Sequence, residues 1–247
     1  MKFSIITVCY NSGATLEETI RSVLSQTHKD VEYIIVDGCS MDNTKEIVDK
    51  YREHLAHFIS EPDKGIYDAM NKGLSLATGE IIGILNSDDI YKNNDVLSKV
   101  AHAFQSDIDC LGTDVEIFDG TPDHVIRYYS CAGWKPWMLR IGHQPPHPGF
   151  FVRRKCYDSF GLFDTGYRSA ADFDLLLRFI YKHECKTVFQ AWTSVAMRSG
   201  GESQRSFKNI ARANREVHNS LRRNGYISFL SLCWTRYLLK IFQFRKF

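Results

Sequence analysis

Residues 79–89 read Gly-Glu-Ile-Ile-Gly-Ile-Leu-Asn-Ser-Asp-Asp, an apolar strand that ends abruptly in two adjacent carboxylates. Two unpaired negative charges side by side are costly at the end of a buried strand, so a cation is expected beside Asp88 and Asp89. Carboxylate oxygens suit Mg²⁺ or Mn²⁺, and such an ion can bridge to a phosphate. The alternative is that both acids cap a helix that starts near Asn94, because Asp is a common turn and cap residue.

Strands and helices alternate through the N-terminal half. Apolar runs predict strands over 2–8, 32–36 and 56–60, followed by the strand that ends at the two acids. Helices are predicted over 15–26, which opens with a capping box at 15–18, over 42–52, and through about residue 76. This alternation is typical of a parallel sheet with helices on both faces, whose ligands bind at the carboxyl ends of the strands. The acids at such ends are Asp37, Asp63, Asp88 and Asp89.

Four segments of this half resemble the family 2 glycosyltransferases with a GT-A fold, in particular the bacterial branch that builds O-antigen and exopolysaccharide units. The segments are Thr7 to Asn11, Val36 to Thr44, Asp63 to Gly73 and Asn86 to Asp89. The resemblance covers roughly residues 1–205 and implies an α/β fold with a Rossmann-like, mostly parallel central sheet. It implies a nucleotide-sugar-binding half over 1–100 and an acceptor-binding half over 101–205, with a helical extension over 206–247.

The resemblance also implies the reaction. The family transfers a sugar from a nucleotide donor, here a hexose or N-acetylhexosamine from a UDP sugar, with inversion, to a saccharide acceptor linked to polyprenyl diphosphate. Mn²⁺ or Mg²⁺ would be the cofactor, with Asp89 as metal ligand and Asp88 beside it. Asp37 would contact the nucleotide, although it and Asp42 could instead share a helix-cap role. The implied donor-binding residues are Thr7, Tyr10, Asn11, Asp37, Asp63, Lys64, Asn71 and Asp88.

An inverting transfer needs a base that takes the proton of the acceptor hydroxyl. Residues 161–174 resemble the family's acceptor-side motif, in which Asp172 occupies the position of the catalytic base. Asp174, two residues on, would point elsewhere. The alternative for Asp172 is an N-cap over the following leucines. His147 could complete the metal site or line the acceptor pocket.

One position departs from the family pattern. Many relatives carry Arg where Met70 stands, and that side chain reaches toward the donor. A cation needed there would have to come from elsewhere, and Lys64 and Arg198 are the candidates.

Two other classes of protein share this pattern of strands and helices. A dinucleotide-dependent oxidoreductase is excluded, because no G-x-G-x-x-G fingerprint follows the first strand. A non-catalytic protein that binds nucleotide sugars, or a scaffold on the same fold, is the remaining alternative to an enzyme. The presence together of Asp37, Asp88, Asp89 and Asp172 argues against it.

Composition is that of a soluble enzyme with one substantial core: 247 residues, 44% of them hydrophobic. The seven cysteines are odd in number and scattered, which argues against a disulfide framework and a zinc site and for a reducing cytosol. No secretory signal is visible at the N-terminus. We therefore expect a cytoplasmic protein.

The C-terminal segment differs in charge from the rest of the chain. Residues 205–247 hold ten Lys or Arg and one Glu, a net charge of +9, whereas residues 1–204 carry a net charge of −7. Apolar residues over 226–244 fall mostly on one helical face, and charges interrupt them too often for a spanning helix. This pattern predicts a basic amphipathic helix at the anionic inner face of the plasma membrane. The alternative is a helix that packs on the enzyme or in a homodimer.

Overall fold

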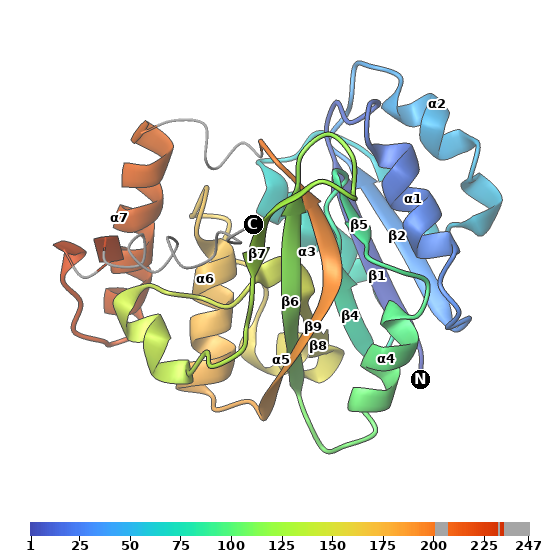
Figure 1. The fold of residues 1–247 in the computed structure, drawn as a ribbon. Helices are drawn as coiled ribbons and strands as arrows, with labels where there is room; N and C mark the ends of the chain where they lie inside the picture. Colours follow the sequence, from blue (N-terminus) through green and yellow to red (C-terminus); the bar gives the residue numbers. More distant parts are fainter. Residues whose placement is uncertain (201–206, 232, 235–247) are drawn as a thin grey trace.

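The computed structural model describes residues 1–200, 207–231 and 233–234. Nine strands form one sheet in the order β3-β2-β1-β4-β8-β6-β9-β5, with β7 paired to β6 outside this path (Figure 1). The strands are β1 (Phe3–Cys9), β2 (Val31–Asp37), β3 (His57–Ser60), β4 (Ile81–Ile84), β5 (Asp89–Tyr91), β6 (Cys110–Phe118), β7 (Val125–Tyr129), β8 (Phe150–Arg153) and β9 (Thr187–Arg198).

The helices lie in the connections between these strands and after the last one. They are α1 (Leu16–Leu24), α2 (Thr44–Asp49), α3 (Ile66–Leu76), α4 (Val96–Ala103), α5 (Arg154–Phe160), α6 (Ala171–Leu176) and α7 (Phe207–Arg223). Shorter helical turns are η1 (Arg52–His54), η2 (Pro136–Ile141) and η3 (His147–Gly149), and η4 (Leu177–Lys182) continues α6 as a π-helix.

The predicted alternation is confirmed in the N-terminal half. Strands β3, β2, β1 and β4 are all parallel, so their carboxyl ends lie at one edge of the sheet. Every residue of β1 is buried, as expected of a central strand covered on both faces. The strand before the two acids is shorter than predicted: β4 ends at Ile84, and Asp89 begins a new strand, β5, that pairs with β9.

The second half of the chain extends the same sheet with mixed pairing. Strand β8 is antiparallel to β4, β6 is antiparallel to β8, and β9 is parallel to β6. Both halves therefore share one sheet. The candidate acceptor-side residues and the candidate donor-side residues are attached to the same rigid support.

Two hydrophobic cores cover the two faces of the sheet. One contains buried residues of α1, α2 and α4, and the other contains those of α3, α5, α6 and α7. Figure 1 shows α1, α2 and α4 together on one side of the strands. Helix α3 lies very close to β1, because a Cβ atom at Gly73 would be 2.4 Å from Cγ2 of Ile6. The first turn of α3 and the end of β1 are thereby held at the same edge.

The capping box predicted at the start of α1 does not form. Thr15 is the N-cap residue, but its side chain makes no capping hydrogen bond. Glu18, which would have completed the box, instead pairs with Arg198 of β9 at 2.6 Å. An ion pair with a distant strand has replaced the local hydrogen bond of the capping box.

The described part of the C-terminal extension packs on the enzyme. Val217 and Leu221 on α7 are buried in the core that contains α6, and the two helices lie side by side in Figure 1. The predicted helix over 226–244 lies mostly outside the described residues, and 226–229 are not helical. Within the described ranges, no helix is both long and apolar enough to cross a bilayer.

Gly73→Ala should destabilise the protein, although alanine is the better helix former. The added Cβ would overlap Ile6, a fully buried branched side chain, and overpacking of this kind costs about 1–3 kcal/mol. Urea unfolding measures the change in the free energy of unfolding. The control is Ser75→Ala on the exposed side of α3, which should have little effect. A Gly73→Ala protein as stable as wild type would contradict the close packing of α3 on β1.

Candidate active site

Loops after β1, β2 and β3 converge at the carboxyl edge of the sheet. A Cβ atom added to Gly38 would lie 2.5 Å from Oδ2 of Asp63 and 3.4 Å from Cδ2 of Tyr10, so the three residues are in contact. Tyr10 is 63% exposed, and its ring is free to stack on a planar ligand. The edge therefore offers an aromatic face beside a carboxylate.

Two predicted donor-binding residues lie deeper than these. Asp37 is fully buried and accepts hydrogen bonds from the backbone N–H and hydroxyl of Ser40 and, at 2.6 Å, from the hydroxyl of Ser60. Thr7 is also fully buried, and its hydroxyl is 3.1 Å from that of Tyr33. In this structure both side chains form hydrogen bonds with neighbouring residues and so stabilise the carboxyl edge of the sheet. Their contact with a nucleotide stays a prediction.

The loop after β1 is tied to its neighbours by side chains. Asn11 has a positive φ of 49° and its Oδ1 accepts the backbone N–H of Met41 at 2.9 Å. The hydroxyls of Ser12 and Ser87 are 2.8 Å apart, which joins this loop to the segment that carries the two acids.

The other predicted residues of the donor side lie just before α3 or within it. Oδ1 of Asp63 accepts the backbone N–H of Gly65 at 2.8 Å, and Lys64 is exposed. Asn71 makes two hydrogen bonds to the backbone of Phe163, at 2.9 and 3.0 Å. Asn71 thus joins α3 to the motif at 161–174, a role the sequence did not indicate.

Asp88 and Asp89 occupy the short connection between β4 and β5. Asp89 is 1% exposed, and burial followed by the charge of Asp88 raises the pKa of Asp89 well above its usual value. Burial also raises the pKa of Asp88. Neither acid caps a helix, since α4 begins at Val96 with Asp95 as its N-cap. The alternative that Asp88 and Asp89 cap the next helix is therefore wrong.

Among the described residues, Arg198 is the cation whose charge acts on this pair. The charge of Arg198 lowers the pKa values of Asp88 and Asp89 against the larger effect of burial, whereas Met70 is buried in the core. Arg198 is half-buried and already paired with Glu18. Of the two candidate cations, Arg198 is the one whose charge acts on the acids.

The residues present fit a hard divalent cation. Besides the two carboxylates, Oδ1 of Asn86 is buried and has no hydrogen-bond partner among the described residues. Nδ2 of the same side chain donates to Asp89 at 3.1 Å, so the amide is held beside the acid. An orphaned amide oxygen next to two carboxylates is the type of donor set that Mg²⁺ and Mn²⁺ prefer.

Asp172 lies at the start of α6, where its carboxylate is held by two neutral donors. Tyr67 donates to Oδ1 at 3.1 Å and Nε2 of Gln144 donates to Oδ2 at 2.7 Å. The N-cap of α6 is Ala170, and no side chain caps the helix, so the capping role considered for Asp172 is wrong. Burial, and then the charge of Asp172, raise the pKa of Tyr67, which keeps the phenol protonated as a donor.

Asp174 points away from Asp172, as predicted. Its carboxylate pairs with Arg178 at 2.8 Å and accepts hydrogen bonds from Ser220 at 2.7 Å and Asn224 at 3.1 Å. These partners join α6 to α7. Asp174 therefore has a structural role, which leaves Asp172 as the available carboxylate.

His147 lies on the same side as Asp172. Burial lowers the pKa of His147, with a smaller opposing effect from the charge of Asp172, and its ring packs edge-on against Phe163 with centroids 5.8 Å apart. Within the described residues, no group of three close His, Cys, Asp or Glu ligands includes His147, Asp88 or Asp89. Its geometry fits the acceptor-side alternative, and its role as a metal ligand stays a prediction.

Two residues were missed by the sequence reasoning. Tyr67 belongs to the quoted motif at 63–73, but nothing in the sequence showed that its hydroxyl would reach a carboxylate 105 residues away. Gln144 stood beside the prolines that precede His147. Its Oε1 is buried and has no hydrogen-bond partner among the described residues. This side chain therefore offers an unused acceptor next to Asp172.

The chain is similar to known proteins in sequence and in fold. The model of glycosyl transferase family 2 matches residues 4–176. The chain belongs to this family. A relative from Mycobacterium bovis (strain BCG / Pasteur 1173P2), named PGL/p-HBAD biosynthesis glycosyltransferase, is 32% identical over 183 residues, which are 71% of this chain and 68% of that protein.

Solved structures of low sequence identity share the fold. TarS 1-349 from S. aureus, in complex with UDP-GlcNAc, matches with a TM-score of 0.70 at 20% identity, covering 96% of this chain and 72% of that chain. The mannosyltransferase PcManGT from Pyrobaculum calidifontis, in complex with GDP-Man and Mn²⁺, matches with a TM-score of 0.67 at 17% identity, covering 96% and 69%. The predicted α/β GT-A fold is confirmed. None of these three names points to the O-antigen branch.

In buffer without divalent ions, Asp89→Asn should stabilise the protein at neutral pH. A carboxyl whose pKa is raised on folding contributes stability below its unfolded pKa of about 3.9, and loses that contribution as pH rises through the raised value. The stability of the variant relative to the wild type should therefore increase from about pH 5 to about pH 8. Urea unfolding at the two pH values measures this.

Asp123→Asn is the matched control, because Asp123 is an exposed carboxylate between β6 and β7. It should leave the pH dependence as in the wild type. A less stable Asp89→Asn protein at the higher pH would contradict the conclusion that burial and the charge of Asp88 disfavour the ionised form of Asp89.

Proposed function

We propose that this chain is an inverting, metal-dependent hexosyltransferase that moves a hexose or N-acetylhexosamine from a nucleotide sugar to a lipid-linked saccharide. A UDP sugar is the favoured donor, and a sugar chain on polyprenyl diphosphate, of the O-antigen or exopolysaccharide type, is the favoured acceptor. Residues 1–100 would bind the donor and residues 101–205 the acceptor. The reaction would form a glycosidic bond to an acceptor hydroxyl and release the nucleoside diphosphate.

The proposal rests on the hydrogen bonds of the Asp172 carboxylate. Its two oxygens each accept one hydrogen bond from a neutral donor, and no cation is paired with it among the described residues. A carboxylate held this way keeps lone pairs for a hydroxyl proton, and its orientation is fixed in advance. Deprotonation of the acceptor hydroxyl as it attacks the anomeric carbon is the step assigned to Asp172.

The donor side is assigned to the loops at the carboxyl edge. Tyr10 would stack on the base, and Asp37, Asp63 and the loop at Asn11 would bind base and ribose. Mn²⁺ or Mg²⁺ would be held by Asp89, Asp88 and Oδ1 of Asn86, and when bound would neutralise charge that develops on the leaving diphosphate. The UDP-GlcNAc complex of TarS and the Mn²⁺ in the PcManGT complex support this class of donor and cofactor.

Asp172→Asn should leave donor binding nearly unchanged while kcat falls by roughly 10²-fold or more, the scale of a positioned general base. Turnover of UDP sugars measures kcat, and calorimetry measures binding of UDP with Mn²⁺. Asp164→Asn, an exposed acid of the same motif that accepts the N–H of Gly166 at 2.8 Å, is the control and should stay active. A parallel loss of donor affinity and turnover in Asp172→Asn would make Asp172 a structural residue.

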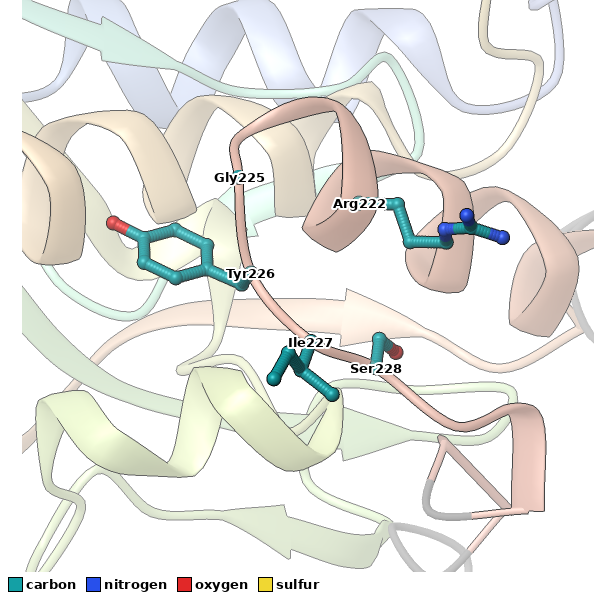
Figure 2. A pocket seen from close by; sticks show the side chains of 5 residues that line it. All are labelled: Arg222, Gly225, Tyr226, Ile227 and Ser228. Atoms are coloured by element: carbon teal, nitrogen blue, oxygen red, sulfur yellow. The ribbon is translucent and has the colours of Figure 1, made fainter.

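A peripheral membrane location is part of the same proposal. Ile227 is 76%, Phe229 61% and Trp137 55% exposed, and large apolar side chains grouped on a surface mark a site of interaction. Arg140 of η2 donates to the carbonyl of Ile227 at 3.2 Å, so the segment at 226–228 lies against the turn that carries Trp137. A pocket of 380 Å³ lies here and is lined by Arg222, Gly225, Tyr226, Ile227 and Ser228 (Figure 2). Exposed apolar and basic side chains together favour contact with anionic lipid.

The double variant Ile227→Ser with Phe229→Ser should bind phosphatidylglycerol vesicles more weakly than the wild type. Hydroxyls in place of these side chains remove apolar surface that would insert among the lipids. Cosedimentation at low and high salt is the measurement, and Val188→Ser, which alters an exposed apolar residue of β9, is the control. Wild-type protein that stays in the supernatant at low salt would refute the membrane contact and favour a homodimer surface.

A further inference from the structure

Three cysteines that are far apart in the sequence meet at the opposite edge of the sheet from the candidate active site. Cys110 opens β6, Cys156 lies in α5 and Cys185 precedes β9. The strand register places Cys110 level with Val152, which is level with Ile82 near the start of β4. This cysteine group (Cys110, Cys156 and Cys185) takes no part in the function proposed above. The scattered spacing in the sequence had argued against such a grouping.

The three sulfurs converge on one point inside the protein. Their Sγ atoms lie within 4.8 Å of one another, and those of Cys156 and Cys185 are 4.0 Å apart. The exposed fractions of Cys110, Cys156 and Cys185 are 0%, 1% and 8%. A zinc ion holds thiolates at about 2.3 Å, which in a tetrahedral site separates two sulfurs by roughly 3.8 Å. Small side-chain adjustments would therefore bring all three sulfurs to a common ion.

We propose that the cysteine group binds one Zn²⁺ ion through its three thiolates. The donor atoms are all sulfur, which selects a thiophilic ion over Mg²⁺ or Mn²⁺. Zinc takes four ligands, so the fourth position is left for water or for the imidazole of His183, two residues before Cys185. The ring of His183 stacks on Phe160 of α5 with centroids 4.2 Å apart, which keeps it beside the helix that carries Cys156.

Basic residues stand next to two cysteines of the group in the sequence. Three thiolates and one Zn²⁺ have a net charge of −1. Lys155 and Lys186, each next to a cysteine of the group, pair with Asp109 and Asp107. Arg153 donates to backbone carbonyls and forms no ion pair among the described residues, although its charge also acts on Asp107.

A metal at this position would have a structural role. It would join the first residue of β6, helix α5 and the chain just before β9, three segments that are far apart in the sequence. Closing such loops lowers the entropy of the unfolded chain, and a metal that binds only the folded state stabilises it by mass action. Bound Zn²⁺ should accordingly raise the melting temperature.

Titration of the reduced full-length chain with Co²⁺ tests the proposal. Unlike Zn²⁺, cobalt bound to thiolates gives intense sulfur-to-metal charge-transfer absorption, and a tetrahedral site adds strong visible bands. One Co²⁺ should bind per chain with these bands, and one equivalent of Zn²⁺ should displace it. Cys185→Ser should lose the charge-transfer absorption and the rise in melting temperature with Zn²⁺. Cys131→Ser, a fully buried cysteine outside the group, should keep both.

Failure of the wild type to show sulfur-to-cobalt absorption would overturn the proposal, whatever the variants do. So would full absorption in a folded Cys185→Ser protein. If Cys185→Ser does not fold, Cys185→Ala and the wild-type titration decide the question. These readouts do not depend on sugar transfer, so the zinc site and the proposed function can fail separately.

Discussion

Two adjacent acids near the carboxyl edge of the sheet set the central constraint on this structure. Asp88 and Asp89 lie in the connection between β4 and β5, and the second is almost without exposure to water. A pair of buried carboxylates cannot remain ionised without a nearby positive charge. Arg198 supplies part of it, but it also pairs with Glu18. We propose that a bound cation supplies the remainder; Oδ1 of Asn86, beside Asp89, has no hydrogen-bond partner among the described residues.

Helix α3 connects this charged edge to the acceptor side. Its first turn begins at the loop that carries Asp63, its Tyr67 holds Asp172, and its Asn71 holds the backbone of Phe163. Close packing on β1 fixes the helix relative to the sheet. A single element therefore sets the position of the base relative to the donor loops, and a shift of α3 would disturb both.

The sequence predicted the first half of the fold because that half is regular. Short alternating strands and helices leave few topologies to choose from, and the acids at strand ends fall at one edge by necessity. The second half was harder, because β6 and β9 pair with strands distant in the sequence. Local signals also failed where tertiary contacts replaced them, as at Glu18, which pairs with Arg198 rather than completing a capping box.

Within the site, residue types were predictable and partners were not. Asp172 could be singled out from its motif, but its donors lie 28 and 105 residues away, and no spacing rule links them. The cysteine group could not be predicted for the same reason, because its three members come together only when the sheet has formed. Asp37 shows the opposite case: its position at a strand end was predicted, but its full burial among serine hydroxyls was not.

Calorimetric binding of UDP with and without Mn²⁺ tests the central claim most directly. If the carboxylate pair binds a divalent cation that in turn binds a diphosphate, Mn²⁺ should tighten UDP binding at least tenfold, which corresponds to about 1.4 kcal/mol. By linkage UDP should tighten Mn²⁺ binding by the same factor. The coupling should disappear in Asp89→Asn. Equal affinity for UDP in the presence and absence of Mn²⁺ in the wild type would contradict the account.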